Sequence, residues 1–276
     1  MASAPTTIDP DLSIDSVRLA VSDLQRSADF YERVLGLPLI AREDERALLG
    51  VDPRHPALEL SAIADPTALS PHSTGLFHVA WLHPSRAGLA ETIKRVARAG
   101  WPIDGASDHG VSEALYLSDP DGLGIEIYVD RPRERWQRPP GGHGVRMVTL
   151  ALDLDDLLAQ APGEPEDAAE RIEPGTGVGH VHLKVADVPR AVAFYRDTFG
   201  LEEQAQLPSA AFLSAGGYHH HIGLNSWQSR GASPSPPSAP GLREIGFTFE
   251  HGAERPAFVD PDGIALSFGA TPTATG

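Results

Sequence analysis

An internal repeat constrains the fold of this chain more than any other feature of its sequence. The segment 16–37 reads SVRLAVSDLQRSADFYERVLGL, and the segment 180–201 reads HVHLKVADVPRAVAFYRDTFGL. The two segments align without a gap at an offset of 164 residues (180 − 16 = 164). Self-similarity of this kind indicates that one structural unit is built more than once.

Each copy of the repeat carries the signals of a strand followed by a helix. It begins with alternating residues, which is typical of a strand. Asp23 or Asp187 then stands where a helix N-cap belongs, and Gly36 or Gly200 stands where the helix should end. The Phe-Tyr pair inside each copy lies on the apolar side of this helix, so we assign it to core packing.

Two further modules can be traced, one after each copy of the repeat. The second opens at 75–81, has a helix near 85–99 and closes at Asp130, whereas the fourth opens at 241–247 and closes at 260–268. In the fourth module only residues 250–256 separate the first strand from the last hairpin, which is too short for a helix. We therefore predict an α+β fold of four tandem βαβββ modules in two repeats, the fourth shortened.

The modules divide the chain into two halves and a linker. We predict an N-terminal domain at 1–130 that holds modules 1 and 2, and a C-terminal domain at 179–276 that holds modules 3 and 4. The linker at 131–178 should contain a short strand near 146–150 and a short helix near 154–161.

Composition excludes several classes of partner and of metal site. The chain has no cysteine, so any metal must be held by His, Asp or Glu. The 22 Lys and Arg residues against 38 Asp and Glu residues give a formal net charge of -16, which argues against nucleic acid or an anionic membrane as a partner. No apolar run is long enough to span a bilayer, and the N-terminus lacks a signal-peptide pattern, so we expect a cytoplasmic protein.

The segment 109–126, HGVSEALYLSDPDGLGIE, carries the strongest chemical signal in the sequence. The Asp-Pro-Asp-Gly stretch within it is typical of a turn, because Pro fixes φ and Gly supplies a positive φ. Beyond the turn, Glu126 stands between two isoleucines on a strand that should be mostly buried. A carboxylate in that position is costly unless it is paired or binds a metal.

This segment resembles the signature of the type I extradiol ring-cleavage dioxygenases of the vicinal oxygen chelate superfamily. The segments GHVHLKV and LSAGGYHHHIGLNSW add a similarity to the CatE-type catechol 2,3-dioxygenase branch. The resemblance implies that Glu126 is an iron ligand, that His109 moves a proton during O₂ activation and that Tyr116 hydrogen-bonds the substrate. It also implies aromatic catabolism, in which the ring of a catechol is opened next to the diol.

In that superfamily two modules pair to form a cup, with ligands on the first and last strands. His78 and His180 occupy the first-strand position in modules 2 and 3, whereas modules 1 and 4 carry Ser16 and Glu244 there. Pairing of modules 1 and 2 would leave only His78 and Glu126, and pairing of modules 3 and 4 would bring together His180 and Glu244, with His220 as a further candidate. We favour pairing of modules 2 and 3, which assembles His78, Glu126 and His180. Two His and one carboxylate suit Fe(II), with Mn(II), Zn(II) or Ni(II) as alternatives.

The run His219-His220-His221 is a further candidate for the site. If the preceding loop is two residues shorter than in module 2, His220 falls where Glu126 falls. It would then point into the cup while His219 and His221 point away, by the period of two in a strand. His220 could be a fourth ligand or a proton-transfer group, and the sequence leaves both open. His182 lies on the same strand face as His180.

Three functions remain open at this point. The first is a non-haem Fe(II) extradiol dioxygenase that acts on a catechol-type diol and O₂. The second is a metal-dependent isomerase or lyase of the glyoxalase type, which a fourth ligand at His220 would favour. The third is a metal-free protein that sequesters a drug-like ligand. The sequence sets no oligomeric state, and a homo-oligomer is compatible with each.

Overall fold

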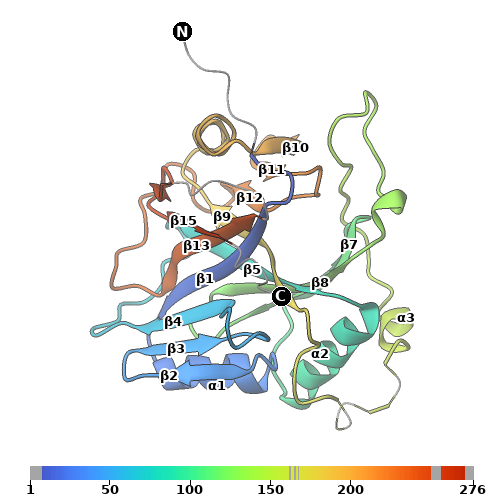
Figure 1. Ribbon diagram of the computed structural model, residues 1–276, viewed down its shortest axis with the longest axis vertical. Helices are drawn as coiled ribbons and strands as arrows, with labels where there is room; N and C mark the ends of the chain where they lie inside the picture. Colours follow the sequence, from blue (N-terminus) through green and yellow to red (C-terminus); the bar gives the residue numbers. More distant parts are fainter. Residues whose placement is uncertain (1–7, 162, 165, 167, 250–255, 271–276) are drawn as a thin grey trace.

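The strands of this protein form two curved sheets, one of seven strands and one of eight (Figure 1). The computed structural model describes residues 8–161, 163, 164, 166, 168–249 and 256–270. Within this part of the chain no helix is both long enough and apolar enough to cross a bilayer.

The eight-stranded sheet is built by modules 2 and 3, in the order β10-β11-β12-β9-β5-β8-β7-β6. Module 2 supplies β5 (Gly75–His83), α2 (Arg86–Arg98), β6 (Gly105–Asp108), β7 (Ser112–Ser118) and β8 (Gly124–Asp130). Module 3 supplies β9 (Gly177–Lys184), α4 (Val188–Ala193), the π-helical turn η3 (Phe194–Phe199), β10 (Glu202–Leu207), β11 (Ala210–Ser214) and β12 (Ile222–Asn225). The two modules are joined by the antiparallel pair β5 and β9 at the centre of the sheet.

The seven-stranded sheet is built by modules 1 and 4, in the order β14-β15-β13-β1-β4-β3-β2. Module 1 supplies β1 (Ser13–Val21), α1 (Leu24–Arg33), β2 (Leu39–Arg42), β3 (Arg46–Leu49) and β4 (Leu58–Ala62). Module 4 supplies β13 (Gly241–Phe249), β14 (Phe258–Val259) and β15 (Ala265–Ala270). The segment 250–256, in which we expect no helix, lies outside the described residues except for Pro256.

The α+β fold of tandem βαβββ modules is therefore confirmed, and so is the pairing of module 2 with module 3. Each sheet takes one module from each half of the sequence, since β1 pairs with β13 and β5 pairs with β9. The boundaries 1–130 and 179–276 thus describe the order of modules along the chain. Each sheet contains strands from both of these halves. The division into two domains at those boundaries stays a prediction.

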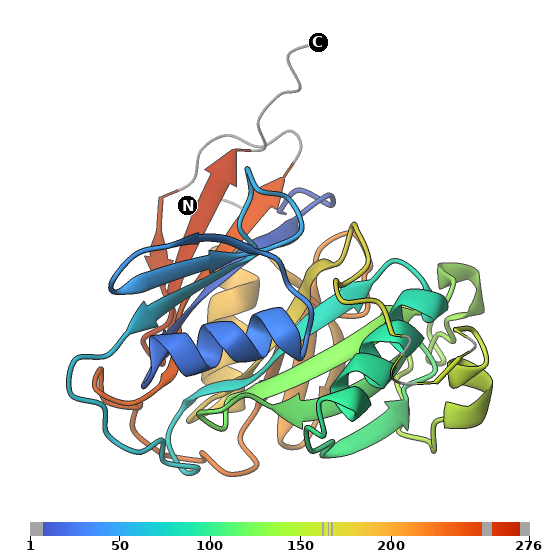
Figure 2. The same ribbon diagram turned by 90° about the horizontal axis from the view of Figure 1, so that it is seen from below.

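The helices pack on the strands of their own modules. The helix α1 contacts β3 and β4, α2 contacts β5 and β8, and α4 contacts β11 and β12; Figure 2 shows α1 and α2 from below. Asp23 and Asp187 cap their helices as predicted, because their carboxylates accept from the backbone N–H groups of Arg26 and Arg190. The left-handed Gly36 (φ 78°) and Gly200 (φ 95°) follow the helical segments.

The linker between the halves contains the 3₁₀ turn η1 (Arg133–Arg135) and the helix α3 (Leu154–Leu158). The helix confirms the prediction near 154–161, but the strand expected at 146–150 is wrong. Leu150 forms only an isolated bridge with Asp108, through backbone hydrogen bonds of 2.9 and 3.0 Å. The residues before it are held elsewhere, because the backbone N–H of Arg146 donates to the carbonyl of Gln137 and that of Val145 donates to Gln204.

A buried arginine ties α2 to the rest of the fold. The guanidinium of Arg95, 1 % exposed, donates to the carbonyls of Leu35 and Ala169 at 2.6 Å each and to the Thr92 hydroxyl at 2.7 Å. It thereby joins the end of α1 and the linker to the helix that backs β5 and β8.

Replacing Arg95 by Met should lower the free energy of unfolding by about 2–4 kcal/mol, because it leaves buried carbonyl groups without their donors. Chemical denaturation followed by circular dichroism measures this change. Arg33→Met is the control: Arg33 is exposed and pairs with Asp29 at 3.5 Å, so its loss should cost less than about 0.5 kcal/mol. Equal losses in the two variants would contradict the assigned role of Arg95.

Candidate metal centre

Three side chains from three neighbouring strands converge inside the eight-stranded sheet. His78 lies on β5, Glu126 on β8 and His180 on β9. The Nε2 atoms of His78 and His180 lie 3.0 and 3.1 Å from the same carboxylate oxygen, Oε2 of Glu126. One ligand atom from each residue lies within 4.8 Å of the other two, and all three residues are buried. The favoured pairing of modules therefore brings the predicted set together.

Strand register explains this convergence. Ala80 on β5 pairs with Glu126 on one side and with His180 on the other. His78 precedes Ala80 by two residues, so it lies on the same face of the sheet. The alternate residues of the same strands, among them Val79 and Ile125, join the main hydrophobic core. The alternation of apolar and polar residues thus places His78, Glu126 and His180 on the face of the sheet opposite the main hydrophobic core.

Burial and mutual contact set the charge of these groups. Burial raises the pKa of Glu126, but its interactions with His180 and His78 outweigh this effect and hold the pKa well below its ordinary value. Burial lowers the pKa of His180 to about 4, against the opposing effect of Glu126. At neutral pH the site therefore holds an ionised carboxylate and a neutral His180 imidazole, which are the protonation states that bind a metal.

The donor set fits a divalent ion. The Nε2 atom of His78 is buried and has no hydrogen-bond partner among the described residues, although it lies beside Glu126. A buried polar atom left without a partner is rare and calls for an explanation, and an ion between the three ligand atoms supplies one. Two imidazoles and one carboxylate suit Fe(II) and leave positions open for other ligands.

His109 and Tyr116 stand next to this centre. Nδ1 of His109 lies 2.8 Å from the carbonyl oxygen of Val148, and Nε2 lies 2.6 Å from the Tyr116 hydroxyl. Because a carbonyl can only accept, Nδ1 carries the proton and Nε2 of the neutral ring accepts from Tyr116. Tyr116 also pairs across the strands with Glu126, and burial, followed by the Glu126 charge, raises the pKa of Tyr116. The Tyr116 hydroxyl therefore keeps its proton at neutral pH.

The His run differs from the sequence prediction. Its three residues precede β12, so the alternation of a strand does not apply to them. His219 does not point away: its Nδ1 lies 2.8 Å from Nδ1 of His220, and its Nε2 lies 2.9 Å from the Asp130 carboxylate. The ring centroids of His220 and His180 are 4.0 Å apart, so His220 does lie at the site. His221 accepts from the backbone N–H of Ala215 instead.

The equivalence of His220 and Glu126 is also wrong. On β8, Glu126 lies two residues beyond Gly124, which pairs with His78. In module 3, Gly223 on β12 stands at the matching place, because it pairs with His182, two residues beyond His180. A Cβ at Gly223 would meet the His182 ring at 2.8 Å, so this position holds no side chain. The His182 ring therefore lies against Gly223, where module 2 has Glu126. The Nε2 atom of His182 is buried without a hydrogen-bond partner among the described residues.

The described residues of the seven-stranded sheet offer no comparable set. The groups of three or more metal-binding side chains found in the described residues lie on the eight-stranded sheet and on the loop before β12. At the matching first-strand positions, Ser16 is a poor ligand and Glu244 forms an ion pair of 2.5 Å with Arg18. Pairing of module 1 with module 4 thus leaves that cup without a metal centre in the described part of the chain.

A cleft with a volume of about 470 Å³ opens beside His78. His78, Tyr116 and Phe77 line it, together with Lys184 from the end of β9. The indole of Trp227, 52 % exposed, stands 5.2 Å from the Phe77 ring. Aromatic rings, the Lys184 ammonium and the carboxylates of Asp104 and Asp121 thus lie along the approach to His78.

The sequence reasoning missed Asp130 and Lys184. Asp130 ends the strand that carries Glu126 and lies four residues beyond it, on the same face of β8. Lys184 lies four residues beyond His180 on β9 and also shares its face. Extending the period-of-two pattern from each ligand to the end of its strand would have found both.

Comparison with known proteins now places this architecture. The model of the Glyoxalase/Bleomycin resistance protein/Dioxygenase superfamily matches residues 13–127 and 177–253. The chain belongs to this superfamily. It is 42% identical over 252 residues to a protein named catechol-2,3-dioxygenase from Bacillus subtilis, across 90% of this chain and 87% of that protein. A protein named biphenyl-2,3-diol 1,2-dioxygenase 2 from Rhodococcus globerulus is 26% identical over 117 residues, which cover 41% of this chain and 60% of that protein.

Solved structures of the superfamily share the fold. Glyoxalase I from Zea mays superposes with a TM-score of 0.55 at 17% identity, covering 93% of this chain and 92% of that one. This similarity concerns the fold alone. Membership of the superfamily rests on the matched family model and on the 42% identity across 90% of this chain.

Replacing Glu126 by Ala should abolish Fe(II) binding, because it removes the one carboxylate of the three-residue set. The protein should stay folded, since the apolar residues on either side of Glu126 still pack in the core. Metal analysis after anaerobic loading measures the stoichiometry. Glu244→Ala, the matched change in the other sheet, should leave it unchanged. Full metal content in Glu126→Ala would show that the ion is held elsewhere.

Proposed function

We propose that this protein is a non-haem Fe(II) extradiol dioxygenase that opens the ring of a catechol-type diol. The observation that carries the proposal is the convergence of His78, Glu126 and His180 beside the hydrogen-bonded pair Tyr116 and His109. The 42% identity to a protein named catechol-2,3-dioxygenase supports the same class of reaction. Bound Fe(II) would supply the centre at which the diol and O₂ are brought together.

Tyr116 and His109 would bind and deprotonate the diol. The Tyr116 hydroxyl lies in the cleft beside His78 and keeps its proton, which it donates to His109, so its oxygen can accept a hydrogen bond from a substrate hydroxyl. His109, held by the Val148 carbonyl, has one acceptor nitrogen in contact with Tyr116. A proton from the diol can therefore pass along the hydroxyl to His109.

His220, which lies next to His180, would act as a second proton-transfer group. The carboxylate of Asp130 accepts from Nε2–H of His219, which leaves Nδ1 of His219 to accept from Nδ1–H of His220. With both rings in these tautomers, Nε2 of His220 is the acceptor that no hydrogen bond from the described residues occupies. Asp130 is 24% exposed, so the chain connects the site to solvent.

A metal-dependent isomerase or lyase of the glyoxalase type is the second candidate. The group His180, His219 and His220, whose ligand atoms lie within 4.8 Å of one another, favours it, because a fourth protein ligand could come from there. Gly223 at the place that matches Glu126 argues against a four-ligand centre. A neutral His220 bonded to His219 fits proton transfer better.

Fe(II)-loaded protein should consume O₂ with catechol and release a yellow ring-opened product. His109→Ala should bind catechol nearly as before but turn over about 10²- to 10⁴-fold more slowly, because a positioned proton acceptor is lost. An oxygen electrode and anaerobic binding titrations measure the two effects. Absence of O₂ uptake with every catechol tested would favour the isomerase; unchanged turnover in His109→Ala would remove that residue from the mechanism only.

Replacing His220 by Gln should lower kcat by about 10²-fold or more while the Fe(II) content stays at the wild-type level. His221→Gln is the matched control, since His221 is equally buried but bonds the Ala215 backbone. Metal analysis and steady-state kinetics of both variants decide the case. Loss of metal from His220→Gln, but not from His221→Gln, would instead identify His220 as a fourth ligand.

A further inference from the structure

A buried lysine lines the cleft without an acidic partner among the described residues. Lys184 is only 7 % exposed. Its ammonium donates one long hydrogen bond, 3.4 Å, to the carbonyl of Pro71, and burial lowers its pKa with no compensating carboxylate nearby in the described part of the chain. A buried ammonium has three donors and is costly to leave unpaired. This arrangement calls for an anion from outside the chain.

The position of Lys184 relative to the metal ligands is set by the β5–β9 register. His182 pairs with His78, and Lys184 follows His182 by two residues on the same face. Two residues along a strand span about 6.6 Å, which is comparable to the length of a substituted benzene ring. An aromatic diol held next to His78 would thus direct its far substituent toward Lys184.

The other charged groups of the cleft already have hydrogen-bond partners within the chain. Asp121 accepts from the hydroxyl of Ser22 and forms an ion pair of 2.5 Å with Arg26, and Asp104 accepts from the Ser118 hydroxyl at 2.9 Å. Lys184 is the single Lys or Arg among the described residues that line this cleft. It is therefore the group that would select the charge of a bound molecule.

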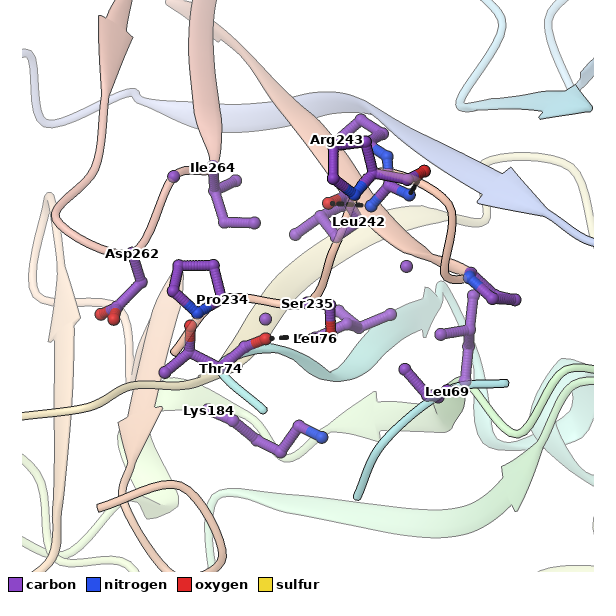
Figure 3. A pocket seen from close by; sticks show the side chains of 16 residues that line it. Leu69, Thr74, Leu76, Lys184, Pro234, Ser235, Leu242, Arg243, Asp262 and Ile264 are labelled. Atoms are coloured by element: carbon purple, nitrogen blue, oxygen red, sulfur yellow. Dashed lines mark hydrogen bonds between the residues drawn. The ribbon is translucent and has the colours of Figure 1, made fainter. Parts of the chain in front are cut away.

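A second cavity, of about 160 Å³, adjoins the cleft where Leu69, Leu76 and Lys184 line both (Figure 3). In Figure 3 the Lys184 side chain has its nitrogen at the end away from Asp262. Arg243 also borders this cavity, but it donates to the carbonyls of Pro237 and Ala239. The junction thus offers space for a short substituent beside the Lys184 ammonium.

Building on the proposed function, we propose that the substrate is an aromatic vicinal diol that carries a carboxylate on its far side, and that Lys184 binds this carboxylate. Lys184 is then a specificity-determining residue of the same site. A hydrogen-bonded ion pair formed in a buried site should favour the acid over a neutral analogue of the same shape by about tenfold or more.

The test compares 3,4-dihydroxyphenylacetate with its methyl ester, by calorimetric titration into Fe(II)-loaded protein in the absence of O₂. The wild-type protein should bind the acid at least about tenfold more tightly than the ester. Lys184→Met, which keeps the apolar stem, should bind both within about threefold of each other and bind the ester as the wild type does. Lys94→Met, the same change at a buried lysine on α2 bonded to Glu91 and Ala161, should keep the wild-type preference.

Equal affinity of the wild-type protein for acid and ester would overturn the assignment without any variant. Retention of the preference in Lys184→Met would also overturn it. Oxygen uptake with unsubstituted catechol separates this proposal from the one on which it rests. Uptake without acid preference would keep the dioxygenase and reject the Lys184 site, whereas acid preference without uptake from any diol would keep the site and reject the dioxygenase.

Discussion

The antiparallel pairing of β5 with β9 is the contact on which the rest of this structure depends. It joins the second module to the third, and its register sets His78 against His182 and Ala80 against His180. The strand β8 pairs with the other edge of β5 and sets Glu126 beside Ala80. The three candidate ligands therefore lie on adjacent strands of one sheet. A slip of one residue in this pairing would turn a whole row of side chains to the opposite face.

The two sheets are joined by a contact that the repeat uses twice. The Tyr31 hydroxyl of module 1 reaches the Asp119 carboxylate in the closing turn of module 2, at 3.4 Å. The equivalent Tyr195 of module 3 reaches Asp260 in the closing turn of module 4, at 3.0 Å. Each tyrosine thus links one sheet to the other, because modules 1 and 2, like modules 3 and 4, belong to different sheets. The Phe-Tyr pairs belong to the architecture, as the sequence indicates.

The inner face of the eight-stranded sheet buries an unusual number of polar groups. His180, His182, His219 and His220 are all nearly inaccessible to solvent, and burial lowers the pKa of His182 and His220 well below the ordinary value. Interiors tolerate such groups only when hydrogen bonds or ions satisfy them. Here part of the set is satisfied internally, through Asp130 and His219, whereas Nε2 of His78 and Nε2 of His182 have no hydrogen-bond partner among the described residues and Lys184 lines the cleft. The hydrogen-bonded groups are thus fixed by the protein itself, and the groups without a hydrogen bond are the ones that a ligand could bind.

The sequence by itself determined the modules and the chemical types at the ligand positions. Helix caps such as Asp23, the Asp119–Gly122 turn and the alternation around Glu126 act over a few residues, so they can be interpreted without knowing the fold. The ligand types on the strands favoured the pairing of modules 2 and 3, but only the tertiary structure decided it, because β5 and β9 are separated by the whole linker and no local backbone signal selects a partner strand. It also decided that Gly223, and not His220, matches Glu126, since loop length sets the register of β12. The contacts of His219 with Asp130 and the position of Lys184 beside the cleft depend on that same long-range pairing, and no local pattern encodes them.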